Sequence, residues 1–339
     1  MFYKAIIQGR LEFGSERSYD KVLKMYEYRT DNYYKNTLIF KAEEIFIPEE
    51  KALVIPRYVA QVTEKSFRNT ASLLDYCSQF AIAGSVRAWQ IDEGKIMHYA
   101  IAEPDSDKAA VQSFIKGRKL VRQHGKEDEA IQALTKAIEK YDRHAQAYER
   151  RAKVNYILKK YHDAKRDYGK CIKLDPTIPT AYYGRAKVHM LEENWEEALS
   201  DLENATKNAI ALQAVYWKAK RLKAQCHINL KQWDKAAFDL KFFCKRKFAE
   251  DDPNYVWRRW GFHHYGIVLL NMEEYTDALE AFDKAADIKS DFGKIEDSEI
   301  LRYRGVAKQK AGKSGYIKDI KEAAKMGDKQ AKNLLKEFA

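Results

Sequence analysis

The chain has 339 residues, of which 45% are hydrophobic and 33% charged, with only 15 glycines and 6 prolines. This composition excludes a disordered, collagen-like or low-complexity protein, and the length predicts two or three domains or one elongated array. The net charge is +11, from 61 Lys and Arg against 50 Asp and Glu. A mean hydropathy of -0.63 and the lack of a long apolar run exclude a transmembrane span.

The cysteines and the first residues bear on the cellular compartment. Cys77, Cys171, Cys226 and Cys244 are far apart and form no CxxC pair, so neither a disulfide framework nor a zinc site is expected. The first residues show no basic segment followed by an apolar core, as a secretory signal would. We therefore expect a basic protein of the reducing cytoplasm.

Residues 1–105 do not repeat, and they alternate between strand-like and helix-like patterns. Two segments have helical spacing, 18–34 and 66–83. Strands are predicted at 2–13, 37–47, 52–62, 85–91 and 95–102, the last two joined by the hairpin signal Asp92-Glu93-Gly94. This order predicts a small α+β domain with a largely antiparallel sheet, for which no family is recognised. Residues 1–105 carry 14 basic and 15 acidic residues, so the whole positive excess lies in the predicted second domain, 106–339.

From residue 106 onward a helical phrase recurs. A small residue is followed four positions later by a large apolar one, in the pairs Ala130/Leu134, Ala164/Tyr168, Ala198/Leu202, Ala236/Leu240 and Ala278/Phe282. Residues four apart share one helical face, so each small residue lets a neighbouring helix approach beside a large side chain. The alanines are spaced by 34, 34, 38 and 42 residues. A preceding helix carries its own small residue twelve positions upstream, so each unit is helix, tight turn, helix.

This phrase resembles the tetratricopeptide repeat (TPR), whose period is 34 residues. Asp175-Pro176 matches the proline that closes a repeat unit, and the resemblance covers about 108–326. It implies an all-α superhelix, an α-solenoid of five to six helix-turn-helix units, and the segment 326–339 is expected to form a short helix that caps the array.

No motif for chemistry is found. The chain lacks GxxxxGK[ST], GxGxxG, GxSxG and HExxH. The tract 311–315, AGKSG, is interpreted as a turn between helices, and the adjacent His263 and His264 point in different directions on a helix. We therefore predict no catalytic residue, metal ligand or cofactor, and no enzyme activity.

The TPR resemblance implies a groove lined by the first helix of each unit. The groove positions carry mostly basic and aromatic residues: Lys153, Tyr156, Tyr183, Lys187, Lys218, Arg221, Trp260, His263 and Arg302. Among the other groove positions is one acid, Glu149. Such a lining suits an extended acidic and apolar peptide, because ammonium and guanidinium groups pair with carboxylates. TPR domains that bind the terminal carboxylate of a chaperone carry Lys, Arg or Asn at fixed groove positions. Three of those positions are occupied here by Arg150, Thr180 and Gly184, which do not match the pattern. Binding of a chaperone's C-terminus is therefore not expected.

A second candidate surface is segment 241–260, KFFCKRKFAEDDPNYVWRRW, in which basic residues alternate with aromatic ones. Cations neutralise phosphates and aromatic rings stack on unpaired bases. The candidate nucleic-acid contacts are Lys245, Arg246, Lys247, Arg258 and Arg259. The same segment also fits a purely structural role, because Phe243 falls on a packing position.

Three hypotheses of function follow. The leading one is a non-enzymatic adaptor or scaffold whose basic groove binds an acidic or extended protein segment. The alternative is an RNA- or ribosome-associated factor that uses the basic array. The third is an unrecognised enzyme activity in the N-terminal domain, whose site the sequence does not reveal.

Overall fold

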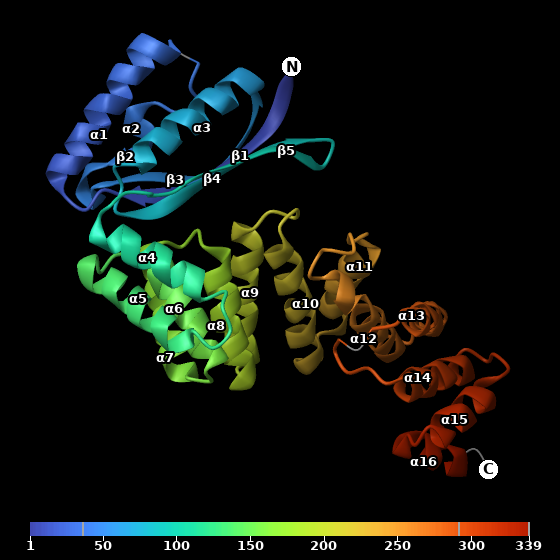
Figure 1. Ribbon diagram of the computed structural model, residues 1–339. Helices are drawn as coiled ribbons and strands as arrows, with labels where there is room; N and C mark the ends of the chain where they lie inside the picture. The colour runs from blue at the N-terminus through green and yellow to red at the C-terminus, as the bar shows by residue number, and fades with distance from the viewer. Residues whose placement is uncertain (36, 291, 338–339) are drawn as a thin grey trace. The chain divides into compact units, whose positions relative to one another are not determined.

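The computed structural model describes residues 1–35, 37–290 and 292–337. Its contacts divide the chain into two compact units, Met1–Val188 and His189–Ala339. The first unit holds a sheet and the first helices of the array, and the second unit holds helices (Figure 1). Each unit is described by itself.

The sheet of the first unit has five antiparallel strands in the order β2-β3-β1-β4-β5. The strands are β1 (Phe2–Glu12), β2 (Phe46–Ile47), β3 (Ala52–Thr63), β4 (Ala83–Asp92) and β5 (Lys95–Ala102). Gly9 interrupts the β1–β3 register at a φ of +138°, and a Cβ there would lie 2.1 Å from the Ser85 carbonyl oxygen. Only glycine allows this close approach of β1 to β4.

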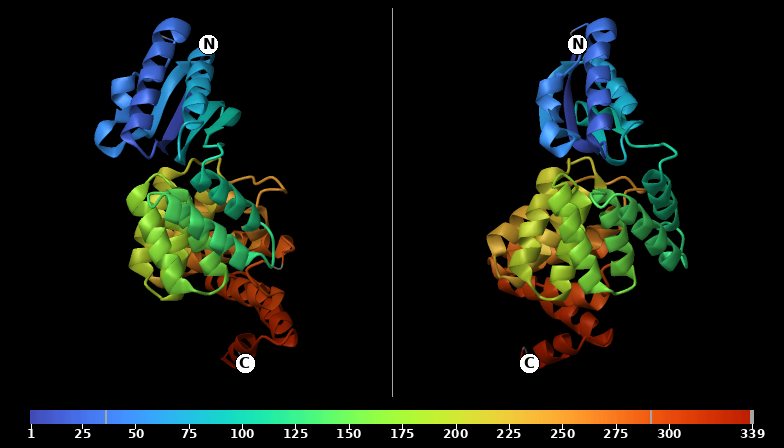
Figure 2. Two further views of the ribbon diagram at one scale, coloured as in Figure 1. Left: turned by 60° about the vertical axis from the view of Figure 1, so that its left-hand side comes forward. Right: turned by 90° about the vertical axis from the view of Figure 1, so that its left-hand side faces the viewer.

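Two helices cover one face of this sheet, α1 (Glu16–Arg29) and α3 (Glu64–Ser78) (Figure 2). Ser15 and Thr63 start them, since each side-chain oxygen accepts a hydrogen bond from the backbone N–H three residues on. The core beneath the helices is built from alternate strand residues and the helices' inner faces, including Ile7, Leu11 and Tyr26. The antiparallel α+β prediction for this region is confirmed.

One strand prediction here was wrong. The segment 37–47 forms the one-turn helix α2 (Ala42–Ile45) and then the two-residue strand β2. A carboxylate oxygen of Glu44 accepts the backbone N–H of Lys41 at 2.7 Å, which fixes the start of that turn. The predicted helix 18–34 is also modified, because its last five residues, Thr30–Tyr34, form a π-helix.

The first unit continues with α4 (Ala109–Leu120), α5 (Glu127–Lys140), α6 (Ala145–Ile157), α7 (Tyr161–Leu174) and α8 (Pro179–Leu191), whose last residues belong to the second unit. The expected domain boundary near residue 105 falls in the segment between β5 and α4. That boundary stays a prediction.

The second unit holds the remaining helices (Figure 1). They are α9 (Trp195–Asn208), α10 (Ala214–Asn229), α11 (Trp233–Lys245), α12 (Arg258–Asn271), α13 (Tyr275–Asp287), α14 (Asp297–Lys310), α15 (Tyr316–Lys325) and α16 (Lys329–Glu337). A 3-10 turn, Tyr255–Trp257, precedes α12, and α16 is the short helix expected within 326–339. Tract 311–315 is the turn between α14 and α15, as predicted.

The repeated pairs pack as their spacing predicts. All five alanines and their large partners are buried, from Ala130 with Leu134 to Ala278 with Phe282. Glycines of the first helices lie against these large side chains: a Cβ on Gly117 would meet Leu134 at 2.6 Å, and one on Gly266 would meet Phe282 at 2.6 Å. Small and large residues are therefore matched across each helix pair.

The turn inside each unit uses the left-handed conformation. In four units the residue seven positions after the small residue of the first helix has a φ between 55° and 62°. These residues are Lys159, Glu193, Lys231 and Glu273. Gly125 and Gly312 stand at the corresponding turns of the first and last units, with φ of 81° and 66°. A left-handed residue ends each first helix and leads directly into the second.

Candidate binding surfaces

Four predicted groove residues belong to first helices of the first unit. Lys153 and Tyr156 stand on α6, and Tyr183 and Lys187 stand on α8. The Lys187 ammonium lies 3.8 Å from the centroid of the Tyr156 ring. Lys153 is exposed and the other three are half-buried. We call these four residues the first-helix surface.

The two lysines are the charged residues among these four. Burial, helped by the nearby Tyr161 and Tyr183, raises the pKa of Tyr156, so its hydroxyl stays protonated and can donate a hydrogen bond. Glu149, the acid expected in the groove, is 5% exposed, and its carboxylate lies 3.2 Å from Arg150 Nε. The acid is thus withdrawn from the surface that the two lysines occupy.

The equivalent positions of the second unit are mostly packed inside it. The Arg221 guanidinium lies 3.7 Å from the Trp257 ring centroid and 5.3 Å from that of Trp260. Trp260 in turn stacks on His264 at 3.9 Å. Burial lowers the pKa of His264 to about 4, despite its hydrogen bond with the Trp260 carbonyl. Lys218, also on α10, is half-buried.

His263 and Arg302 connect helices within the second unit. His263 is 1% exposed, and its Nε2 lies 3.6 Å from Glu299 Oε1. Burial, together with nearby His264, Arg302 and Arg259, lowers its pKa to about 2, so the ring is neutral. Arg302 donates to Asp328 at 3.0 Å and lies over the Tyr303 ring. These contacts hold α12, α14 and the start of α16 together.

Segment 241–260 divides into exposed cations and packed aromatics. Lys245, Arg246 and Lys247 are exposed. Phe243 and Phe248 are buried in one cluster with Trp217.

The two arginines that begin α12 have partners inside the second unit. Arg258 lies over the Tyr255 ring and donates to the Tyr255 carbonyl at 3.1 Å. Arg259 is 4% exposed, bonds the carbonyls of Ile288 and Ile295, and pairs with Asp297. These contacts give Arg259 a structural role in closing the loop before α14.

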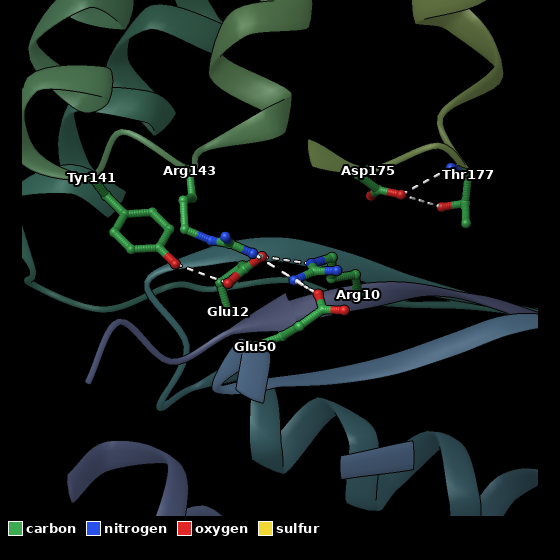
Figure 3. Close-up of polar contacts among 7 residues, drawn as sticks. All are labelled: Arg10, Glu12, Glu50, Tyr141, Arg143, Asp175 and Thr177. Carbon is green, nitrogen blue, oxygen red and sulfur yellow. Dashed lines mark hydrogen bonds and ion pairs between the residues drawn. The ribbon is translucent and has the colours of Figure 1, made fainter. Parts of the chain in front are cut away.

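A polar network that the sequence did not predict joins the sheet to the first repeats (Figure 3). Glu12 of β1 is 3% exposed and accepts hydrogen bonds from the Tyr141 hydroxyl at 2.8 Å and from Arg10 Nε at 2.5 Å. Arg143 lies 3.5 Å from the same carboxylate, and Arg10 also pairs with Glu50. Burial and the Glu12 charge raise the pKa of Tyr141, so it remains a donor.

This network borders a cavity of about 720 Å³ that Asp175 also lines. Asp175 is 2% exposed and accepts hydrogen bonds from the backbone N–H and hydroxyl of Thr177 at 2.9 and 2.6 Å (Figure 3). Burial raises its pKa, although the Thr177 bonds oppose that effect. Lys170 and Lys173 add cations, but the lining also holds Glu49, Glu50 and Asp142, so the cavity favours no single charge.

A second feature missed from the sequence is a repeated ion pair. In three units the residue just before the small residue of the first helix is basic, and an Asp of the second helix faces it. Arg151 bonds Asp167 at 2.8 and 2.9 Å, and Arg304 bonds Asp319 at the same two distances. Lys223 lies 3.6 Å from Asp239. The signal was present, since Asp recurs three residues after the alanine at 167, 201 and 239.

The described residues were also searched for other sites. In residues 1–35, 37–290 and 292–337, no group of three or more His, Cys, Asp or Glu is placed to hold a metal ion. None of the helices in this part of the chain is both long and apolar enough to cross a bilayer. Burial raises the pKa of Cys77 and of Cys226 to about 12, so both thiols are protonated at neutral pH.

Comparisons with known proteins agree with the repeat. A family model described as tetratricopeptide repeat matches residues 145–178, which are α6, α7 and the turn after them. A DnaJ homolog subfamily C member 7 homolog from Schizosaccharomyces pombe is 33% identical over 85 residues, 24% of this chain and 17% of the relative. Serine/threonine-protein phosphatase T from Aspergillus oryzae is 33% identical over 100 residues, 30% of this chain and 21% of the relative. The chain thus spans about a fifth of the length of these curated relatives.

Solved structures give the fold. YrrB, described as a TPR protein with an unusual peptide-binding site, matches 61% of this chain and 99% of its own at a TM-score of 0.51 and 21% identity. The structure of pilF from Pseudomonas aeruginosa matches 68% of this chain and 98% of its own, at a TM-score of 0.50 and 16% identity. Because the small-large pairs, the left-handed turns and these matches coincide, the chain carries a tetratricopeptide repeat at 145–178, and its helices after the antiparallel α+β region have the fold of TPR proteins.

Proposed function

We propose that the protein is a non-enzymatic adaptor of the cytoplasm whose first-helix surface binds an extended, acidic protein segment. The observation that carries the proposal is the pairing of Lys187 with the Tyr156 ring across two successive first helices. It places a cation and an aromatic ring side by side on α6 and α8. An acidic residue next to an apolar one is the ligand that this pair fits.

The other two residues extend the same chemistry. The exposed Lys153 adds a second cation on α6, while Tyr183 adds a second ring on α8. An extended peptide presents side chains at regular intervals. The lysines of the surface can therefore pair with its acidic side chains, and the tyrosine rings can contact its apolar ones. The peptide-binding site named for the similarly folded YrrB is consistent with this use of the fold.

The proposal rests on the first unit because the corresponding second-unit residues are engaged in packing. Reversing the charge of Arg221 would leave a carboxylate against Trp257, so loss of binding in that variant would reflect misfolding. Lys153 and Lys187 are the informative pair, since neither side chain is buried.

The test is a selection of random displayed peptides on the full-length chain, followed by affinity measurements on Lys153→Glu/Lys187→Glu. We expect peptides enriched in Asp or Glu beside apolar residues, and a loss of at least about tenfold in affinity, equivalent to 1.4 kcal/mol, in the double variant.

The matched control is Lys136→Glu/Lys321→Glu, which changes the charge equally at exposed sites of second helices α5 and α15. It should leave affinity unchanged. Peptides without an acidic bias, or equal losses in both double variants, would rule out the first-helix surface as the binding site.

RNA or ribosome binding stays the second hypothesis, on the observation that Lys245, Arg246 and Lys247 form an exposed basic run at the C-terminal end of α11. Binding through phosphates would weaken steeply with salt and would be reduced by neutralising these three residues. Cosedimentation with ribosomes that is insensitive to salt, or that survives the triple neutralisation, would count against it.

A further inference from the structure

Helix α11 differs from the other second helices in being apolar on two faces. Its inner face is buried, with Ala236, Leu240 and Phe243 in the core. Its outer face carries Phe238 and Phe242, which are 59% and 47% exposed. A helix that has neighbours on one side only is expected to be polar on the other.

The corresponding positions elsewhere are polar. Two and six residues after the alanine, the second helices α5, α7, α9 and α13 carry Gln132 and Lys136, Arg166 and Lys170, Ser200 and Asn204, and Glu280 and Lys284. All but Asn204 are exposed. Two exposed rings are thus a property of α11 and not of the repeat, so packing of the array does not explain them.

Cations alternate with the rings along the outer face. Phe238, Lys241, Phe242 and Lys245 stand at i, i+3, i+4 and i+7, which places them in one row on the helix. Lys241 and Lys245 are exposed. We call this row the α11 stripe. The exposed Asp234 and Lys235 precede it in the first turn of α11, and Arg246 and Lys247 follow it, so the net charge around the stripe is positive.

The two rings are held in place. They meet edge to face with centroids 4.9 Å apart. The Lys220 ammonium of α10 lies 5.3 Å from each centroid and is fixed by its hydrogen bond to Asp239, at 2.7 Å. The stripe therefore offers an ordered apolar contact, which lowers the entropy cost of binding.

We propose that the α11 stripe is a second docking surface, which takes an acidic amphipathic protein segment with two apolar anchors. The anchors pack on Phe238 and Phe242, and carboxylates beside them pair with Lys241 and Lys245. Charge complementarity selects this occupant, because the rings favour apolar side chains and every cation of the stripe follows a ring by three residues. The stripe shares no residue with the first-helix surface.

The experiment uses the full-length chain and peptides recovered from a random displayed library, with oligouridylate as the nucleic-acid probe. Affinities are measured for wild type, Phe238→Ser/Phe242→Ser, Lys241→Glu/Lys245→Glu and the first-helix variant Lys153→Glu/Lys187→Glu. Tyr33→Ser is the matched control, since Tyr33 is an exposed ring, 67% exposed, in the N-terminal domain.

We expect a class of acidic, apolar peptides whose affinity falls at least about tenfold in both α11 variants. The Tyr33 and first-helix variants should leave that class unchanged. All four substituted α11 side chains are exposed, so thermal unfolding should match wild type.

The proposal is overturned if every recovered peptide keeps its affinity in Phe238→Ser/Phe242→Ser, or if oligouridylate displaces the peptides that depend on the stripe. Peptides that depend only on Lys153 and Lys187 would overturn it while supporting the proposed function. Peptides that depend only on the stripe would support this proposal and overturn the proposed function of the first-helix surface.

Discussion

Replacing Gly184 with Ala tests whether close packing between repeats, rather than helix propensity, sets the stability of the first unit. Gly184 lies in α8 against Tyr168 of α7. A Cβ on Gly184 would lie 2.1 Å from Tyr168 Cζ and 2.5 Å from its hydroxyl oxygen. Tyr168 is 4% exposed, so its ring cannot move into solvent without losing its burial.

Two effects of opposite sign determine the result. Overpacking costs about 1–3 kcal/mol, whereas Ala in place of Gly inside a helix gains about 0.5–1 kcal/mol. We expect Gly184→Ala to destabilise the first unit by about 0.5–2 kcal/mol. In a Tyr168→Leu background the ring atoms that cause the clash are absent. There the same substitution should stabilise by about 0.5–1 kcal/mol.

The assay is native-state hydrogen exchange of amides in α6 to α8, because unfolding of a repeat array is not all-or-none. Gly184→Ala should speed exchange by about 2- to 30-fold in the wild-type background and slow it in Tyr168→Leu. A substitution that changes exchange equally in both backgrounds would show that Tyr168 and Gly184 are not coupled, and would refute the packing argument.

Three further outcomes are expected. Lys231→Gly should raise the free energy of unfolding of the second unit by about 1 kcal/mol, because Lys231 has a φ of 55°, which glycine adopts without strain. Lys235→Gly inside α11 should lower that free energy by a similar amount. Urea titrations in which both variants shift the unfolding midpoint in the same direction would contradict this. Burial raises the pKa of Asp319, but hydrogen bonds from Arg304 and Lys308 outweigh it and hold the pKa below its ordinary value. The Asp319 carboxylate therefore stabilises the fold above about pH 4, and the difference in urea midpoint between wild type and Asp319→Asn should shrink as pH falls further, not stay constant. Burial raises the pKa of all four cysteine thiols. Iodoacetamide should therefore label the native protein far more slowly than the urea-unfolded protein. Rapid labelling of the native chain would show that the thiols are accessible.

The repeats were predictable because their signal is local. Ala164 and Tyr168 pack only with helices that are their neighbours in sequence, α6 and α8, so a spacing of four residues already predicts that both face these helices. The same spacing located Lys153 and Lys187 on first helices, and the structure places Lys187 against Tyr156. Angular position on a helix follows from residue number alone.

Burial could not be predicted in the same way. Arg221 and Trp260 have the sequence positions of surface residues, but the long segment between α11 and α12 brings Trp257 against the Arg221 guanidinium. Such contacts depend on where a loop passes in space, which periodicity does not encode. The strand predicted at 37–47 was wrong for a related reason. Its apolar residues suit either a strand or a buried helical turn, and the hydrogen bond from the Lys41 N–H to Glu44 stabilises the turn.

The strand order of the sheet has a consequence for synthesis on the ribosome. β1, at the start of the sheet, lies between β3 and β4, so it gains both neighbours only after residue 92 has been made. At about 5–20 residues per second, an apolar strand stays without one neighbour for several seconds. Each repeat, by contrast, closes on the helix made just before it. Chaperone demand during translation should therefore concentrate on the first segment of the chain and not on its longer helical part.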